Sequence, residues 1–181
     1  MNTTDRIKLQ SGNILTKHGF KIQAEVFDNI RRDTISSEEM IRFFKGYFPQ
    51  IRTSMKDTNF KITELEPWQN FIDKCWLKEK QWTADDFDCD DFSDTFGVFA
   101  KLALKVSVSK IYGRLLNKDT EKPFEGTGMG YHYWYSFVII SPNGKRLYFY
   151  EPINGLMVQY LGQQKIIMGS GMYVPEQVIC N

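Results

Sequence analysis

The hydrophobic pattern of the chain changes its period from that of a helix to that of a strand. Apolar residues from Cys89 onward recur at steps of three and four, at Cys89, Phe92, Phe96, Phe99, Ala103 and Val106. This spacing places them on one face of a helix. Residues 131–140 and 145–151 are instead rich in aromatic and β-branched side chains, and Ser141-Pro142-Asn143-Gly144 separates them. That arrangement predicts a β-hairpin.

The N-terminal part reads as polar and helical. Helices are expected over 24–32 and 37–48, the second opened by the capping box Ser36-Ser37-Glu38-Glu39 and ended by Pro49. Residues 49–62 show no clear period and predict a connection. We therefore expect a helical N-terminal region over 1–60 and a second domain over 61–181.

Further elements are expected in the second domain. Pro67 suits the first turn of a helix whose apolar stripe includes Cys75, which indicates a core thiol. Residues 110–116 predict a short strand, and residues 117–130 a polar loop. One or two further strands are expected after residue 156.

Composition then narrows the class of protein. The chain has 181 residues, of which 42% are hydrophobic and 25% charged, as in a soluble globular protein. A net charge of +1 gives no field to hold nucleic acid. No apolar run is long enough to cross a membrane, and the start lacks a secretory signal pattern. Three cysteines, an odd number, favour a reducing compartment. These features predict a cytoplasmic protein with no membrane or nucleic-acid partner.

Several classes of site lack their sequence signals. Two histidines and three cysteines are too few and too scattered for a zinc finger or ribbon. The chain has no Gly-rich phosphate loop, no dinucleotide fingerprint and no Gly-x-Ser-x-Gly nucleophile motif. His18 lies in a polar stretch and is expected at the surface, and Cys180, next to the last residue, is expected to be exposed and inert.

One thiol, one imidazole and one carboxylate remain as a candidate for nucleophilic chemistry. A helix N-terminus would stabilise a Cys89 thiolate and offer an N–H group to an oxyanion. If Ile140 pairs with Lys145, Glu151 lies opposite Trp134, two residues from His132 on the same face. Side chains can close that diagonal of about 7–8 Å. Taken singly, a cysteine and a histidine are more often core residues; together they favour a nucleophile and its base.

Phe87-Asp88-Cys89-Asp90-Asp91-Phe92, Gly130-Tyr131-His132-Tyr133-Trp134 and Tyr150-Glu151-Pro152 resemble segments of papain-like and transglutaminase-like cysteine hydrolases. The similarity is greatest to acidic variants such as bacterial transglutaminase-like peptidases and the papain-like domain of a fungal agglutinin. It covers about residues 80–155. The resemblance implies an α+β fold, with a helix carrying Cys89 on an antiparallel sheet carrying His132 and Glu151, and a triad of these three residues that requires no cofactor. It also implies a second oxyanion donor, for which Gln81, Trp82 and Asn70 are the alternatives.

The five aspartates around Cys89 have two interpretations. Aspartates at a helix start cap it and favour its positive end, which needs no metal. Alternatively, carboxylate oxygens hold calcium or manganese and offset their charge beside the thiol. Asp88 and Asp91, three residues apart, share a helix face and are the ligands expected in that case.

The function expected from these residues is cysteine-dependent acyl transfer on a protein or peptide substrate. With water as the acceptor, the protein is a peptidase or amidase; with an amine, it is transglutaminase-like. The alternative is a non-enzymatic interaction module, an inhibitor or effector, that keeps the papain-like scaffold as a binding surface.

Overall fold

The computed structural model describes residues 29–75, 89–124, 130–163 and 165–180. The described elements are, in chain order, β1 (Arg32–Ser36), α3 (Ser37–Tyr47), β2 (Arg52–Met55), β3 (Asn59–Thr63), α4 (Leu65–Lys74), α5 (Cys89–Leu104), β4 (Ser109–Asn117), β5 (Tyr131–Ser141), β6 (Gly144–Glu151), β7 (Leu156–Tyr160), β8 (Ile166–Met168) and β9 (Gly171–Cys180). Strands predominate over helices in this part of the chain.

All the described strands belong to one mixed sheet. Its main order is β1-β3-β5-β4-β9-β2. Outside this path, β6 pairs with β5, β7 pairs with β6, and β8 pairs with β9. Two pairs, β2 with β9 and β3 with β5, are parallel, and the others are antiparallel. The prediction of a papain-like α+β fold built on an antiparallel sheet is therefore wrong, because the architecture is a large, mostly β, mixed sheet.

After residue 156 the structure has three strands, β7, β8 and β9, where one or two were expected. The strands that the sequence did not predict at all lie before residue 64. β1, β2 and β3 are four or five residues long and polar, with the sequences RDTIS, RTSM and NFKIT. Such short strands, solvated on one face, carry few alternating apolar positions. The hydrogen-bonding partner of β2 is β9, which lies more than a hundred residues further along the chain, so the local sequence pattern could not predict β2. The expected domain boundary at residue 60 falls within β3.

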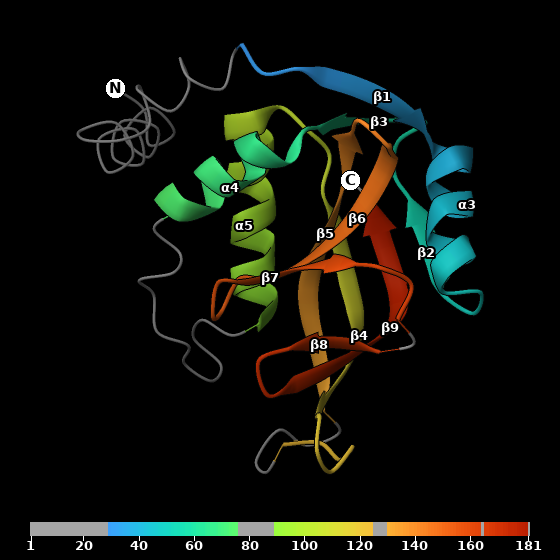
Figure 1. Ribbon diagram of the computed structural model, residues 1–181, viewed down its shortest axis with the longest axis vertical. Coiled ribbons are helices and arrows are strands. Elements are labelled where there is room, and N and C mark those ends of the chain that lie inside the picture. The colour runs from blue at the N-terminus through green and yellow to red at the C-terminus, as the bar shows by residue number, and fades with distance from the viewer. Residues whose placement is uncertain (1–28, 76–88, 125–129, 164, 181) are drawn as a thin grey trace, which may run out of the picture.

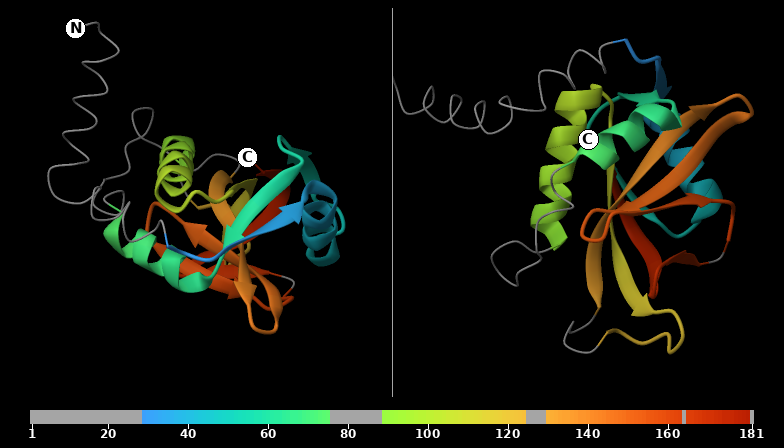
Figure 2. Two further views of the ribbon diagram at one scale, coloured as in Figure 1. Left: turned by 90° about the horizontal axis from the view of Figure 1, so that it is seen from above. Right: turned by 60° about the vertical axis from the view of Figure 1, so that its left-hand side comes forward.

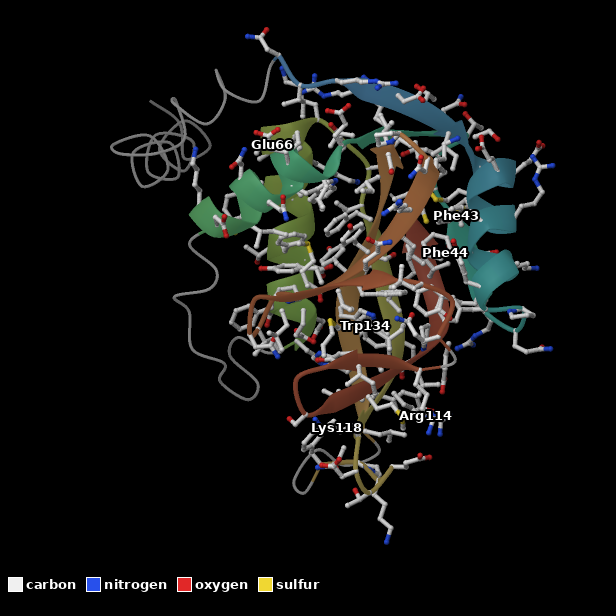
Figure 3. All side chains as sticks on the ribbon, viewed as in Figure 1. Phe43, Phe44, Glu66, Arg114, Lys118 and Trp134 are labelled. Atoms are coloured by element: carbon white, nitrogen blue, oxygen red, sulfur yellow. The ribbon has the colours of Figure 1, made fainter. Side chains whose placement is uncertain are left out.

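Helices cover both faces of the sheet. Figure 1 shows α4 and α5 beside one face and α3 beside the other, and Figure 2 shows the same layers from two further directions. The core under α4 and α5 includes Trp68, Phe71, Phe92, Phe96, Phe137 and Tyr150. The core under α3 includes Phe44, Ile111, Trp134, Phe149 and Val178. Figure 3 shows Phe44 between α3 and the sheet and Trp134 near the centre of the molecule.

Local signals that the sequence did show are confirmed. Ser36 caps α3 by accepting a hydrogen bond from the Glu39 N–H at 3.1 Å, as the capping box predicts. α5 begins at Cys89, the predicted position. In the hairpin Ile140 pairs with Lys145, and Gly144 takes a φ of 101°, which favours glycine. No helix in the described ranges is long and apolar enough to span a membrane.

Candidate functional site

Cys89 is the first residue of α5 and is partly exposed. This position places the thiol near the positive end of the helix dipole, which favours a thiolate. Asp90 and Asp91 occupy the same first turn, where negative charge complements the helix dipole. The buried Phe92 and Phe96 hold this helix against the sheet.

The structure brings His132 and Glu151 together with Cys89. His132 lies on β5 and is 8% exposed, and Glu151 ends β6 and is 1% exposed. His132 Nε2 lies 2.5 Å from Glu151 Oε2. The ring also forms a side-chain hydrogen bond with Cys89. Because Nε2 contacts the carboxylate, Nδ1 is the nitrogen left for the thiol. The imidazole therefore lies between a sulfur atom and a carboxylate.

The surroundings of His132 change its protonation. Burial by itself would lower the pKa of the imidazole, because it disfavours the charged form. The hydrogen bonds to Cys89 and to Glu151, together with the negative charge that these groups carry, outweigh burial and raise the pKa of His132 to about 9. At neutral pH the ring is thus an imidazolium, and a cation beside a cysteine favours the thiolate.

The Glu151 carboxylate is held by three donors. His132 and the Tyr173 hydroxyl, at 3.1 Å, both contact Oε2, and the Ile153 N–H donates to Oε1 at 3.1 Å. These donors satisfy the acceptor oxygens of a side chain that is removed from water. Burial, followed by the charge of Glu151, raises the pKa of Tyr173 above its usual range, so this hydroxyl remains a donor.

Aromatic rings fix the orientation of the imidazole. His132 stacks on Trp134 with ring centroids 6.1 Å apart and planes 17° apart, and Tyr173 packs at 6.0 Å. Trp134 has room because residue 113 is a glycine: an added Cβ would lie 2.9 Å from the Trp134 ring and 2.2 Å from the Val174 carbonyl oxygen. Sequence reasoning did not find Tyr173, since the pairing of β9 with β4 leaves no local signal.

Part of the acidic surroundings of Cys89 is offset by a lysine. Lys110 Nζ lies 2.7 Å from Asp94 and 4.2 Å from the centroid of the Tyr133 ring. Burial and then the charges of Asp90, Cys89 and Asp94 raise the pKa of Tyr133, which shows how close this tyrosine lies to the start of α5.

The other two cysteines are buried. Cys75 is 5% exposed and belongs to the core, as predicted. Cys180 was expected to be exposed, and this is wrong: β9 places it in the sheet, it is fully buried, and its sulfur lies 3.0 Å from the Ser109 hydroxyl. Burial raises the pKa of Cys180 to about 12, so this thiol remains protonated.

Other predicted site residues lie outside the described part of the chain. These are the oxyanion candidates Gln81 and Trp82 and the metal candidate Asp88. The third oxyanion candidate, Asn70, lines a surface depression with Asn29 and Glu66. Asp91 is exposed on α5. Among the described residues, no group of three or more histidine, cysteine or acidic side chains is arranged to hold a metal ion. The calcium or manganese site stays a prediction.

Comparisons with known proteins identify similar folds rather than a family. No family model matches the chain, and no curated protein matches it in sequence. A solved structure titled "PSL1a-E64 complex" is similar with a TM-score of 0.56 and 15% identity, covering 81% of this chain and 51% of that one. A Polyporus squamosus lectin bound to a Neu5Aca2-6Galb1-4GlcNAc epitope gives a TM-score of 0.46 and 17% identity, covering 71% and 42%. The chain thus spans about half the length of PSL1a and less than half the length of the lectin.

The comparisons also correct the predicted activity. The structural neighbours found are PSL1a and the Polyporus squamosus lectin. The prediction of a cysteine hydrolase, whether peptidase or amidase, and with it the prediction of a thiol protease with a catalytic triad, is contradicted by these neighbours. The geometry of Cys89, His132 and Glu151 is a separate observation, and it concerns the reactivity of one thiol.

Proposed function

We propose that the chain carries an activated thiol that accepts an acyl group, with Cys89 forming a thioester with a ligand bound at the start of α5. The observation that carries this proposal is the position of His132, hydrogen-bonded to Cys89 on one side and 2.5 Å from the Glu151 carboxylate on the other. A histidine held in this way both ionises a thiol and supplies a proton to a leaving group.

The chemistry follows from the three groups. The Cys89 sulfur attacks the carbonyl carbon of an activated acyl donor such as an ester, and the carbonyl π electrons move to oxygen. When they return, the bond to the leaving group breaks, and the leaving group takes the proton from His132. The products are a thioester on Cys89 and a neutral imidazole, whose orientation Glu151 maintains through Nε2.

The start of α5 supports the charged intermediate of this step. The negative oxygen develops next to the sulfur, beside the first turn of α5. Backbone donors at a helix N-terminus also present the positive end of the dipole to such an anion. The partly exposed thiol is open to a ligand, while His132 and Glu151 behind it are shielded from water.

The test measures the reaction rate of each thiol. Iodoacetamide is applied between pH 5 and pH 9, and alkylation at each cysteine is followed by peptide mass spectrometry. Cys89 is expected to react at least about 100-fold faster than Cys75 or Cys180 at pH 6, because His132 is charged there and the other two thiols are buried. E64, the compound named in the PSL1a title, is a second probe of the site.

Variants connect the rate to the site. Cys89→Ser is expected to remove the fast alkylation by iodoacetamide. With p-nitrophenyl acetate as the acyl donor, the wild type is expected to release one nitrophenolate per chain, and Cys89→Ser is expected to release none. His132→Ala is expected to slow Cys89 by about 100-fold or more, within the range found for general acid–base groups. Adding Glu151→Ala to His132→Ala is expected to lower the alkylation rate of Cys89 little further, because the two residues act as one unit. A wild-type Cys89 that reacts no faster than an ordinary exposed thiol would refute the proposal.

The rival function is a non-enzymatic binding module on the same fold. It predicts ordinary reactivity at Cys89 and saturable binding of a ligand that is unchanged in Cys89→Ser and His132→Ala. The glycan in the lectin title, Neu5Aca2-6Galb1-4GlcNAc, is a defined probe for calorimetry. Glycan binding combined with ordinary thiol reactivity would favour this rival.

A further inference from the structure

One glycine of α5 is placed where any side chain would collide with the sheet. A Cβ on Gly97 would lie 2.3 Å from the Tyr135 hydroxyl oxygen and 3.2 Å from Tyr135 Cζ. Glycine within a helix costs about 0.5–1 kcal/mol relative to alanine. Gly97 is buried in the middle of α5 and has an ordinary helical φ, so conformational freedom does not explain it. The glycine at position 97 is explained by the space that the Tyr135 side chain needs.

Tyr135 is held firmly on its side of this contact. Its side chain is 3% exposed on β5, and its ring packs against Phe96 with centroids 5.0 Å apart. Its hydroxyl hydrogen-bonds with the Gly97 backbone. Burial, and then the charge of Asp94, raises the pKa of Tyr135, so the hydroxyl stays neutral. The contact between the Gly97 backbone and the Tyr135 ring therefore limits how closely α5 approaches β5.

The same two elements carry the thiol and the imidazole. Cys89 precedes Gly97 by eight residues, about 12 Å along the helix. His132 precedes Tyr135 by three residues, about 10 Å along the strand. A displacement of α5 at Gly97 is thus transmitted to the distance between Cys89 and His132. Misplacing a reacting group by about 1 Å can cost about 100-fold in rate.

We propose that Gly97 and Tyr135 are positioning residues that set the separation of Cys89 from His132. This inference rests on the proposed function, because it concerns the geometry of the same activated thiol. Neither residue touches the reacting atoms. They act by fixing how closely the helix that carries the sulfur approaches the strand that carries the ring.

The experiment is a double-mutant cycle read out by the pH dependence of Cys89 alkylation. Gly97→Ala is expected to lower the iodoacetamide rate at Cys89 at pH 6 by about 10-fold or more and to move its pH profile toward that of His132→Ala. Tyr135→Phe removes the oxygen at 2.3 Å and its hydrogen bond with the Gly97 backbone, and it is expected to lower the rate by less than Gly97→Ala does, because the buried ring still supports the helix. The double variant Gly97→Ala with Tyr135→Phe is expected to recover part of the rate lost in Gly97→Ala, because the contact at 2.3 Å is removed while the ring carbon at 3.2 Å remains.

A matched control is present in the chain. Gly46 lies in α3, and a Cβ added there meets nothing within 4 Å. Gly46→Ala is therefore expected to leave both the rate and the pH profile of Cys89 unchanged. If Gly97→Ala does not fold, the comparison moves to the Tyr135→Phe background, where Gly97→Val must lower the rate again relative to Gly97→Ala.

The outcomes separate this inference from the proposed function. A fast wild-type Cys89 whose rate and pH profile are unchanged in folded Gly97→Ala would overturn the positioning role alone. A loss of thermal stability with an unchanged pH profile would also overturn it, because a purely structural contact behaves in that way. A slow wild-type Cys89 would refute the proposed function and, with it, the inference.

Discussion

Glu151 shows at the level of single residues how the site is held together. Its carboxylate is buried and its oxygens need hydrogen-bond donors, which the structure supplies from three different segments: β5, β9 and its own turn at Ile153. The pairing with His132 could be predicted from the hairpin register. The donor from β9 could not, because Tyr173 reaches Glu151 only through the long-range order of the sheet.

Replacing Glu151 with Gln is expected to lower the pKa of His132 below about 9, because the negative charge that helps to raise it is removed. The chain has two histidines, so an NMR titration resolves His132 from His18. Cys89 alkylation near neutral pH is expected to fall by about 10-fold or more. Glu176→Gln is the control, since Glu176 pairs with the exposed Arg114 and is expected to change neither quantity. An unchanged pKa of His132 would show that Glu151 does not set its charge.

Replacing Tyr173 with Phe removes one donor from the buried carboxylate. A buried acceptor that loses its partner costs about 1–3 kcal/mol, and we expect a decrease of that size in the free energy of unfolding measured in urea. Tyr112→Phe, at a partly exposed position, is expected to change it by less than about 0.5 kcal/mol. Equal effects of the two substitutions would contradict the assigned hydrogen bond.

At the level of elements, local pattern decides which helices and strands could be predicted from the sequence. α5 and the β5–β6 hairpin were predictable because their patterns are local: one apolar helix face, and two alternating runs around a tight turn. β1 to β3 were missed because each is short, and β2 is stabilised by a distant partner. Cys180 was misplaced for the same reason, since β9 buries it against β4.

α5 is attached to the sheet largely through Phe96. This ring is fully buried and packs against Tyr150 at 4.6 Å, Tyr135 at 5.0 Å and Phe71 at 5.4 Å. Phe96→Ala is expected to lower the free energy of unfolding by about 3–5 kcal/mol, through lost burial and the cavity left behind.

The exposed face of the same helix provides the comparison. Val98 is 57% exposed, and Val98→Ala is expected to cost less than about 0.5 kcal/mol in the same denaturation experiment. Similar losses for Phe96→Ala and Val98→Ala would contradict the packing of α5 against the sheet through Phe96.

At the level of the whole molecule, one sheet separates two cores, and β5 contributes to both. Tyr135 and Phe137 face α4 and α5, while Trp134 and Val138 face the core under α3. His132 is on the Trp134 side of the strand and also contacts the thiol on α5. The site therefore forms only when both cores are assembled, and its chemistry is linked to folding of the described sheet as a whole.

This linkage predicts how stability depends on pH. The pKa of His132 is raised from 6.5 to about 9 in the folded state, so the folded protein binds a proton more tightly than the unfolded chain. The stabilisation from His132 is therefore fully present below about pH 6.5 and is lost as the pH rises to about 9.

His132→Gln keeps a donor for Glu151 but does not titrate. The difference in urea unfolding free energy between the wild type and His132→Gln is expected to be constant near pH 5–6, to shrink between pH 6.5 and 9, and to level off above. A difference that grows with pH would mean that burial, not the Cys89 and Glu151 contacts, dominates at His132.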